Sequence, residues 1–410
     1  MKAGPFGSSL KKAFYVADGY KIYGQEQVIA GDPELGDYFI DGDRFAALRA
    51  CEVLPGDILI SLVGTIGKVL VIPEGAQAGI INPRLLRLSL DESQADPRFT
   101  AFLVESDAAQ RWMAGASQGG TMGVLNASIL KSLPLRLPPL SEQRKIAAIL
   151  GSVDALIERT QAVIDQVEVV KKGLMQELLT RGLPGRHTRF KQTEIGEIPE
   201  SWEVVTLGDV VARIDSGWSP RCESVPAGPE EWGVLKVSAA TWGRFRADEN
   251  KRLPDGVEPR PAAEVHPGDL ILSRANTADL VARPVFVTPT DARLMMSDKL
   301  LRLVPGDLLE ARFLKLLLEG SRTRSQLEDR ATGSSKSMKN ISQAKLRTIA
   351  VPLPALEEQL AMGRALDSVE ERLDTESRVL SALGDLKVSL SSVLLSGELR
   401  VQTNDSEVAA

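Results

Sequence analysis

The chain contains an internal repeat, and this repeat limits the possible folds more than any other feature. Residues 133–150, LPLRLPPLSEQRKIAAIL, align without gaps to residues 349–366, IAVPLPALEEQLAMGRAL, 216 positions later. Upstream, PGDILIS at 55–61 recurs as PGDLILS at 267–273, 212 positions later. A repeat of this kind predicts two copies of one structural unit. The length of 410 residues agrees, because one domain usually spans roughly 100 to 200 residues.

Each copy leads into a long amphipathic helix. Ser141 suits an N-cap, Glu142 and Gln143 suit a first turn, and the prolines before them keep the approach extended. Apolar residues then recur at alternating steps of four and three, a period of 3.5 that predicts a left-handed coiled-coil seam. The predicted seam residues are Ile146, Leu150, Val153, Ile157, Ile164, Val167, Leu174 and Leu178 in the first helix, and Met362, Leu366, Val369, Leu373, Leu380, Leu383, Leu390 and Leu394 in the second. The polar positions of the same frame are Thr160, Lys171, Glu376 and Lys387.

The two helices are expected to be each other's partners. Each spans about 41 residues, roughly 60 Å at 1.5 Å per residue, and a lone rod of that length would expose its seam. The predicted fold class is α+β, with two globular domains joined by two long antiparallel coiled-coil helices in a pseudo-twofold tandem repeat. Antiparallel pairing would place the domains at opposite ends. The alternative is that each helix packs onto its own globular domain.

Domain boundaries follow from the repeat and from the turn-rich stretches. They are 1–140 for the first globular domain, 141–182 for the central helix, 183–201 for a linker, 202–355 for the second domain, 356–400 for the C-terminal helix and 401–410 for a disordered tail. Inside the domains, residues 55–73 predict a hairpin or bent strand pair, and 98–114 and 308–329 predict helices.

The two domains differ at their start. The second has residues 202–214 before Asp215-Ser216-Gly217, whereas the first begins almost at the matching Gly4. We therefore expect the first domain to lack its opening strand, either because the start of the sequence is truncated or because the loss is tolerated.

The sequence offers little material for catalysis or metal binding. Its only cysteines, Cys51 and Cys222, lie far apart, and its only histidines are His187 and His266, which excludes a disulfide scaffold and argues against a zinc site or a catalytic triad. GTIGK at 64–68 lacks the spacing and the Ser or Thr of a phosphate-binding loop. We expect no catalytic residue and no metal site.

Charge and hydropathy place further limits on the partners. The net charge is −6, but residues 356–410 carry 5 basic and 11 acidic groups, so a basic face on either domain is compatible with this total. No stretch approaches the ~18 apolar residues of a membrane span, and the N-terminus lacks the apolar region of a signal peptide. A cytoplasmic protein without membrane contact is expected.

The combined motifs are more specific than any one of them. LPPLSEQ at 137–143 leads into the first helix and LPALEEQ at 353–359 into the second, and GPFGSSLKK at 4–12, PGDILIS and TEIGEIPESWEVVTLGDV at 193–210 accompany them. In this combination the chain resembles the specificity (S) subunit of type I restriction-modification systems, over nearly its full length.

The resemblance implies a function. Each globular domain would be a target-recognition domain that reads one half of a split sequence in double-stranded DNA, and the paired helices would set the gap and dock two methyltransferase (M) subunits. Restriction/translocase (R) subunits would join in the full complex. The resemblance also implies no cofactor in this subunit, with S-adenosylmethionine, ATP and Mg expected on the partner subunits.

Candidate DNA contacts follow from chemistry, because phosphates favour Arg and Lys whereas bases favour Arg, Asn or Gln. In the first domain they are Lys11, Lys12, Arg44, Lys68, Arg84, Gln118 and Thr121. In the second they are Arg244, Arg246, Arg274, Asn276, Lys336, Lys339 and Asn340. An ordinary solvated side chain is the competing interpretation at each position.

Two other functions compete with this one. The chain could be an interaction scaffold of tandem domains on a coiled-coil stalk with no DNA role. It could also be the specificity arm of a related system in which cleavage and methylation share one fused subunit.

Overall fold

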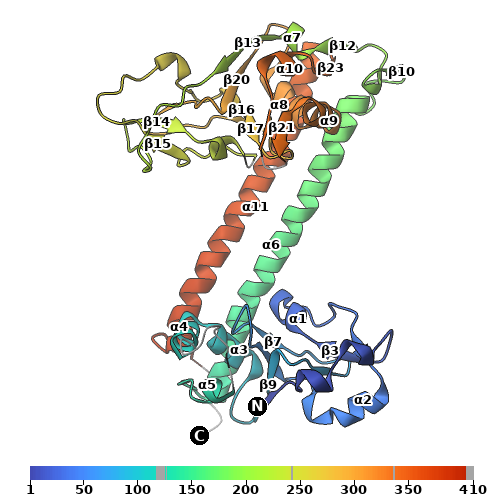
Figure 1. The fold of residues 1–410 in the computed structure, drawn as a ribbon, viewed down its shortest axis with the longest axis vertical. Helices are drawn as coiled ribbons and strands as arrows, with labels where there is room; N and C mark the ends of the chain where they lie inside the picture. The colour runs from blue at the N-terminus through green and yellow to red at the C-terminus, as the bar shows by residue number, and fades with distance from the viewer. Residues whose placement is uncertain (117–124, 126, 242, 336–337, 403–410) are drawn as a thin grey trace. The chain divides into compact units, whose positions relative to one another are not determined.

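The computed structural model describes residues 1–116, 125, 127–241, 243–335 and 338–402, which form two compact units (Figure 1). Unit 1 comprises Met1–Ala162 and Arg378–Ala410, and unit 2 comprises Val163–Ser377. The long helix α6 (Leu140–Arg181) begins in unit 1 and ends in unit 2, whereas α11 (Leu356–Ser396) begins in unit 2 and ends in unit 1. Each unit therefore holds one globular domain and one half of each helix.

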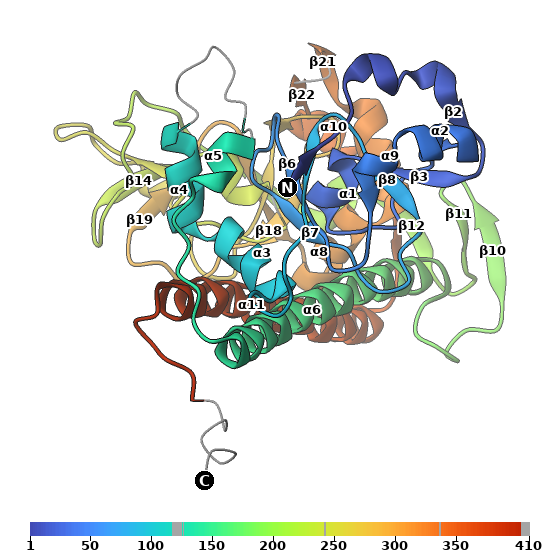
Figure 2. The ribbon, with the colours of Figure 1, turned by 90° about the horizontal axis from the view of Figure 1, so that it is seen from below.

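Unit 1 contains two sheets and a helical layer. The first sheet has the order β1 (Lys2–Ala3), β9 (Leu85–Leu88), β6 (Ile58–Ser61), β7 (Val69–Val71). The second has the order β2 (Tyr15–Val16), β4 (Phe39–Ile40), β3 (Tyr20–Tyr23), β8 (Gly79–Ile81), β5 (Glu52–Val53). The helices are α1 (Gln25–Ala30), α2 (Gly42–Ala47), α3 (Pro97–Glu105), α4 (Asp107–Ala116) and α5 (Ala127–Lys131). In Figure 2 α3 lies beside the end of α11, and an apolar cluster joins them.

Unit 2 has a larger set of sheets. Its main sheet has the order β13 (Val211–Ser216), β20 (Leu300–Pro305), β16 (Leu270–Ser273), β18 (Pro284–Phe286). Two smaller sheets have three strands each, in the orders β15 (Asn250–Arg252), β14 (Trp232–Leu235), β19 (Arg293–Met295) and β17 (Ala275–Asn276), β22 (Met338–Asn340), β21 (Thr332–Ser335). Two more are strand pairs: β12 (Glu203–Thr206) with β23 (Ala350–Leu353), and β10 (Phe190–Thr193) with β11 (Gly196–Pro199). The helices are α7 (Leu207–Val210), α8 (Ala311–Glu319), α9 (Ser321–Arg330) and α10 (Gln343–Arg347).

The main sheets of the two units are copies of each other. The predicted hairpin over 55–73 is confirmed, because β6 and β7 pair antiparallel with Ile58 opposite Val71, as β16 pairs with β18 in unit 2. The edge strands differ in length. β1 pairs only two residues with β9, placing Lys2 opposite Arg87, whereas β13 runs for six residues along β20. Within the described residues, β1 is therefore the shorter counterpart of β13.

A buried glutamine fixes the start of α6 to unit 1. Gln143 is 1% exposed, and its Nε2 donates to the carbonyl oxygens of Gln94 and Pro138 at 3.0 and 2.8 Å. Its Oε1 accepts a hydrogen bond of 2.9 Å from the N–H of Asp96, the residue that caps α3. The side chain thus ties the first turn of α6 to the beginning of α3.

Gln359 makes the same three bonds at the start of α11 in unit 2. Its Nε2 donates to the carbonyl oxygens of Leu308 and Pro354, and its Oε1 accepts from the N–H of Glu310, which caps α8, all at 2.9 Å. Gln359 is 0% exposed and its bond to Pro354 is buried, so the amide supplies there a hydrogen bond that water cannot. The Glu-Gln pair of the repeated motif is therefore a structural clamp.

The predicted seam residues all lie buried or half-buried. In unit 1, Ile146 and Leu150 of α6 share an apolar cluster with Leu390 and Leu394 of α11. In unit 2, the equivalent Met362 and Leu366 of α11 share a cluster with Leu174 and Leu178 of α6. In each unit the start of one helix thus meets the end of the other, and the helices also pack onto their own globular domains through these clusters. The predicted antiparallel arrangement is confirmed within each unit.

The two lysines of the seam form equivalent ion pairs. Lys387 Nζ lies 2.6 Å from Asp154 in unit 1, and Lys171 Nζ lies 2.7 Å from Glu370 in unit 2. Lys171 is also 3.7 Å from Glu319. Burial alone would lower the pKa of Lys171, but the two carboxylates outweigh it and the net shift is upward. A charged residue in a seam favours the register that gives it a partner.

A glutamate at the start of each helix holds the chain that leaves the other. Glu142, which is 4% exposed, accepts hydrogen bonds from the guanidinium of Arg400 and from the N–H of Val401. These bonds, led by the one from Arg400, lower the pKa of Glu142 despite its burial. In unit 2, Glu358 likewise accepts from the indole of Trp202. The predicted tail is thus held at its start, and residues 403–410 lie outside the described residues.

The helices predicted over 98–114 and 308–329 each consist of two. The first is broken between α3 and α4 at Ser106, and the second between α8 and α9 at Gly320, and both residues are extended, with ψ of 148° and 140°. A Cβ at Gly320 would lie 2.3 Å from Leu179 of α6. The prediction of helix over both ranges is confirmed apart from these breaks, which apolar spacing does not reveal.

Helix α11 is also, by length and composition, apolar enough to cross a membrane, with a mean hydropathy of 1.4 in its most apolar window. A single such helix is weak support for a membrane span. In unit 1 the last turns of α11 pack against α3 and α6. Only 6% of that most apolar window is buried, so this packing covers a small part of it.

Replacing Gln359 by alanine is expected to destabilise unit 2. The variant leaves the buried carbonyl oxygen of Pro354 without a partner and removes two part-buried hydrogen bonds, a cost of about 3 kcal/mol in the free energy of unfolding. Gln176→Ala, at an exposed site on α6, is the control and should change it by less than about 0.5 kcal/mol. Urea denaturation measures both, and equal effects for the two variants would contradict the clamp.

Candidate nucleic-acid interface

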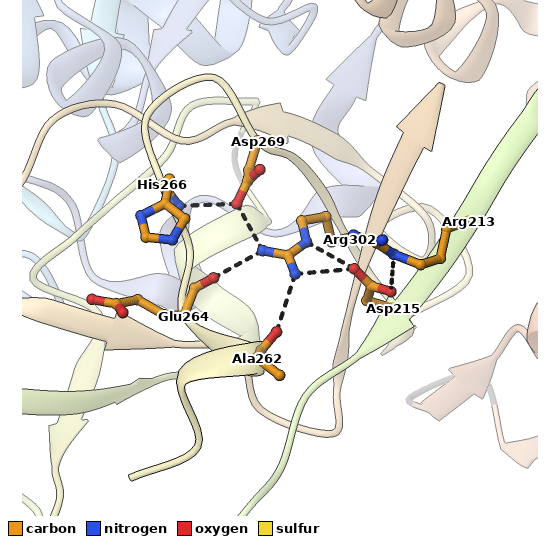
Figure 3. Close-up of polar contacts among 7 residues, drawn as sticks. All are labelled: Arg213, Asp215, Ala262, Glu264, His266, Asp269 and Arg302. Carbon is orange, nitrogen blue, oxygen red and sulfur yellow. Dashed lines mark hydrogen bonds and ion pairs between the residues drawn. The ribbon is translucent and has the colours of Figure 1, made fainter. Parts of the chain in front are cut away.

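A buried arginine organises the main sheet of unit 2. Arg302 on β20 donates from Nε and Nη2 to Asp215, from Nη2 to the carbonyl of Ala262, and from Nη1 to Asp269 and the carbonyl of Glu264, at 2.8–3.1 Å (Figure 3). Burial would lower its pKa, but the bonds to Asp269 and Asp215 outweigh this and raise it. All five guanidinium donors are used inside the protein. Arg302 is therefore a structural cation rather than a ligand-binding one.

A cavity of about 960 Å³ lies beside this network. Among its lining residues are Trp218 and the exposed Arg260, whose guanidinium carbon lies 4.1 Å from the centre of the indole ring. A second stack places Arg293 4.0 Å over Trp232. Cations and aromatic rings are groups that bind the phosphates and stack on the bases of nucleic acids. Sequence analysis missed both stacks, because the residues of each pair lie far apart in the chain and no spacing connects them.

Four predicted contacts of the second domain come together around one small sheet. β17 pairs with β22, so that Asn276 lies opposite Lys339, and Asn340 lies opposite Ala275, the residue after Arg274. Their side chains are partly committed: the Asn276 amide donates to Thr241 at 3.0 Å, and Lys339 donates to the carbonyl of Gly333 at 3.0 Å. The guanidinium of Arg274 is also partly committed, because its Nη1 donates to the carbonyl of Asp298 at 3.4 Å and its Nε is buried.

The other predicted contacts of the second domain have different environments. Arg244 is exposed, and within the described part of the chain no ion pair is recorded for it. Arg246 lies 3.0 Å from Asp248 and 3.6 Å from Glu249, and the hydrogen bond to Asp248 raises its pKa. Arg246 is thus already neutralised within the protein. Lys336 lies outside the described residues.

In the first domain, three predicted contacts lie close together and one lies apart. Lys11 and Lys12 are exposed beside Phe14, and the guanidinium of Arg44 stacks 3.7 Å over that ring. Lys68 instead lines a groove between α4 and α11. Gln118 and Thr121 lie outside the described residues.

Arg84 has a counterpart that sequence analysis missed. The counterpart is Lys299 of unit 2. The backbone carbonyl of Arg84 accepts a hydrogen bond from the N–H of Leu62, and the carbonyl of Lys299 accepts the equivalent bond from the N–H of Arg274. The repeated LLRL at 85–88 and 300–303 was the available signal, because it aligns Arg84 with Lys299. Lys299 lies 3.5 Å from Asp298, whose pKa is lowered chiefly by a hydrogen bond from Ser219.

The exposed cations of these surfaces have the chemistry of polyanion binding. In the described part of the chain no group of three or more His, Cys, Asp or Glu side chains is arranged to hold a metal ion. The cationic residues that remain available lie on loops and short strands.

Comparisons with known proteins also match DNA specificity proteins. The profile of the family described as "Type I restriction modification DNA specificity domain" matches residues 43–169 and 199–383. The Escherichia coli protein "Type I restriction enzyme EcoEI specificity subunit" is 32% identical over 279 residues, which are 67% of this chain and 46% of that protein. This chain thus spans less than half of that relative. The "Type I restriction enzyme MjaVIII specificity subunit" of Methanocaldococcus jannaschii is 26% identical over 410 residues, covering 93% of this chain and 91% of that protein.

A solved structure has a related fold. The "Type-I restriction-modification system S subunit from M. genitalium" matches with a TM-score of 0.58 and 14% identity, covering 96% of this chain and 92% of the other. At this identity the match concerns the fold alone.

Substitution of Arg244 by alanine is expected to weaken binding to duplex DNA and to lower the slope of log affinity against log salt by about one, because one phosphate contact is lost. Arg246→Ala is the matched control and should have the smaller effect, because Asp248 already neutralises that residue. Fluorescence anisotropy across a sodium chloride series measures both slopes. A larger loss for Arg246→Ala would contradict this assignment.

Proposed function

The chain belongs to the type I restriction-modification DNA specificity family, and from that premise we propose that it reads a split DNA sequence as a non-catalytic subunit of a type I restriction-modification complex. Its role is DNA-sequence specificity. The observation that carries the finer proposal is the duplication: two domains built on the same sheet, β1-β9-β6-β7 and β13-β20-β16-β18, each followed by a clamped helix. Two equivalent readers suit a target with two half-sites.

The helices are proposed to set the gap between the half-sites. Their mutual register is supported by the equivalent ion pairs Lys387–Asp154 and Lys171–Glu370, one in each unit. Two helices held in register do not slide along each other, so their length can serve as a fixed spacer. The glutamine clamps add to this, because they limit how each domain turns on its own helix.

The same helices are proposed to dock two methyltransferase subunits, with restriction/translocase subunits joining the full complex. Outward-facing apolar residues support this. Val170 of α6 and its repeat equivalent Leu386 of α11 are 50% and 45% exposed. Apolar side chains left in solvent on a paired helix are typical of a surface that another protein covers. Because the two positions are related by the repeat, each unit would offer a similar surface to its partner.

Catalysis and its cofactors are proposed to reside on those partners. S-adenosylmethionine would bind the methyltransferase, and ATP and Mg the translocase. The isolated chain should therefore neither methylate nor cut DNA, and reproducible turnover by the purified subunit would overturn this part of the proposal.

Insertion of one heptad into each helix tests the spacer role. The insertions are placed after Ala162 and after Ser377, between the two units, so that both lysine ion pairs remain intact. Seven residues add roughly 10 Å, at most about three base pairs, to the distance between the readers. The expected result is a longer gap with both half-sites unchanged, measured by sequencing methylated sites in a host that carries the methyltransferase.

Seven residues inserted after the exposed Gly256 form the control and should leave the gap as it was. An unchanged gap in the double-helix insertion, with activity retained, would refute the spacer role.

A further inference from the structure

The loop that follows β6 in unit 1 and the loop that follows β16 in unit 2 are built on the same hydrogen bonds. Ser61 and Ser273 end these strands at equivalent positions of the repeat. The hydroxyl of Ser61 donates to a carbonyl inside its loop and accepts from the N–H of Lys68 at 3.0 Å. The hydroxyl of Ser273 also donates to a carbonyl inside its loop, and it accepts from the N–H of Arg283 at 3.3 Å. Lys68 and Arg283 are therefore structural counterparts.

The residue before each of these cations adopts a left-handed backbone conformation. The φ angles are 75° at Gly67 and 59° at Ala282, and the N–H of each donates to the carbonyl of its serine, at 3.0 Å in unit 1 and 2.7 Å in unit 2. A left-handed conformation is costly for alanine and persists where the surrounding structure holds it in place. Both loops are thus fixed in shape, and the backbone sets the direction in which Lys68 and Arg283 leave them.

A side chain from a neighbouring helix holds each loop from outside. Gln110 is the fourth residue of α4, and its Nε2 donates to the carbonyl of Gly67 at 3.0 Å. Arg324 is the fourth residue of α9, and its guanidinium donates to the carbonyls of Val281 and Asp279 at 2.6 and 3.3 Å. Since α4 and α9 are counterparts in the repeat, the same helix position holds the same loop in both units.

Positive charge is concentrated at the loop of unit 2. Arg324 is 7% exposed, and its ion pair with Glu328 is long, at 3.9 Å. Burial, followed by the charge of Arg283, lowers the pKa of Arg324 to about 10. Arg283 itself donates from Nε to the carbonyl of Asp279 at 3.0 Å. An anion bound at Arg283 would relieve the repulsion between the two guanidinium groups, because an opposite charge nearby favours the charged form of each.

The two counterpart cations are available to a ligand. Lys68 is exposed and Arg283 is half-buried. Neither forms an ion pair with another residue that the structure describes, and the Nη groups of Arg283 form no hydrogen bond with one. Phosphates favour arginine and lysine, and the phosphate backbone carries the same charge at every DNA sequence. A cation at the same place of two otherwise different surfaces therefore suits a phosphate rather than a base.

We propose that Lys68 and Arg283 bind DNA phosphates at equivalent places of the two domains, and that Gln110 and Arg324 are positioning residues that fix the loops carrying them. The inference rests on the proposed DNA-reading function and adds residues to it. Phosphate contacts orient a domain on the duplex without selecting bases. Sequence analysis included Lys68 but missed Arg283. Lys68 lies 7 positions after its serine and Arg283 lies 10 after, so an ungapped alignment of the repeat does not join them.

The test measures binding of the full-length protein to a fluorescein-labelled duplex of random sequence, by anisotropy across a sodium chloride series. Arg283→Gln and Lys68→Gln should each lower the slope of log affinity against log salt by about one, and the double variant by about two. Arg283→Lys should keep the wild-type slope, because an ammonium group also binds phosphate. Arg252→Gln is the matched control. Arg252 is a half-buried arginine of unit 2 that Glu223 already neutralises at 2.5 Å, so its loss should leave the slope unchanged.

A second set of variants tests the positioning role of Arg324. Arg324→Ala releases the loop, so the slope should fall by about one, and the addition of Arg283→Gln should lower it no further, because both changes remove the same contact. Arg324→Lys, which keeps a cation able to donate to the loop carbonyls, should restore the slope. A further fall of about one in the combined variant would contradict the positioning role.

A wild-type slope in Arg283→Gln would overturn the proposal, and so would an equal fall in Arg252→Gln. The urea midpoint of Arg283→Gln should stay close to that of the wild type, which separates a lost contact from a lost fold. Absence of salt-dependent binding by the wild-type protein would contradict the proposed function and this inference with it. Failure of the inference alone is therefore distinguishable from failure of the proposed function.

Discussion

A lysine within a largely apolar seam favours one pairing of residues between the two long helices. Lys171 meets Glu370 in unit 2, and 216 positions later Lys387 meets Asp154 in unit 1. A shift of one helix turn away from Glu158 and Asp374 would leave each ammonium group without a facing carboxylate, and a partly buried charge without a partner is costly. Apolar side chains alone would tolerate several registers, whereas the two ion pairs favour one. The proposed spacing of the half-sites depends on that register.

The two units share their main sheet and their glutamine clamps because of the repeat, and they differ in the side chains of their surfaces. The clamps made by Gln143 and Gln359 use the same bonds at the same positions. Around this shared frame the surfaces diverge. In unit 2 Arg302 lies between two carboxylates, one of them Asp215 on β13, whereas in unit 1 the cross-strand neighbour of Arg87 is Lys2. Such divergence fits two readers that recognise different bases.

The elements that could be predicted from the sequence are those with a local periodic signal. The 3.5 period located both long helices, and the PGD turns located the β6–β7 hairpin. Features that depend on distant residues were missed. The five bonds of Arg302 join segments up to 87 positions apart. At the break between α8 and α9, Gly320 lies so close to Leu179 of α6 that a Cβ would collide with it. Residue type alone did not distinguish exposed Arg244 from Arg246, which is paired with Asp248. Nor did it distinguish Lys68, in the α4–α11 groove, from the cations around Phe14. The difference lies in partners, which only the fold supplies.

The central claim is that each unit reads one half of the target independently of the other. Exchanging residues 202–353 for the equivalent domain of a relative, while both long helices are kept, tests it most directly. Sequencing of methylated sites in a host that carries the chimera and the methyltransferase should show one half-site replaced, with the other half-site and the gap unchanged. A chimera that changes both half-sites together would contradict the claim.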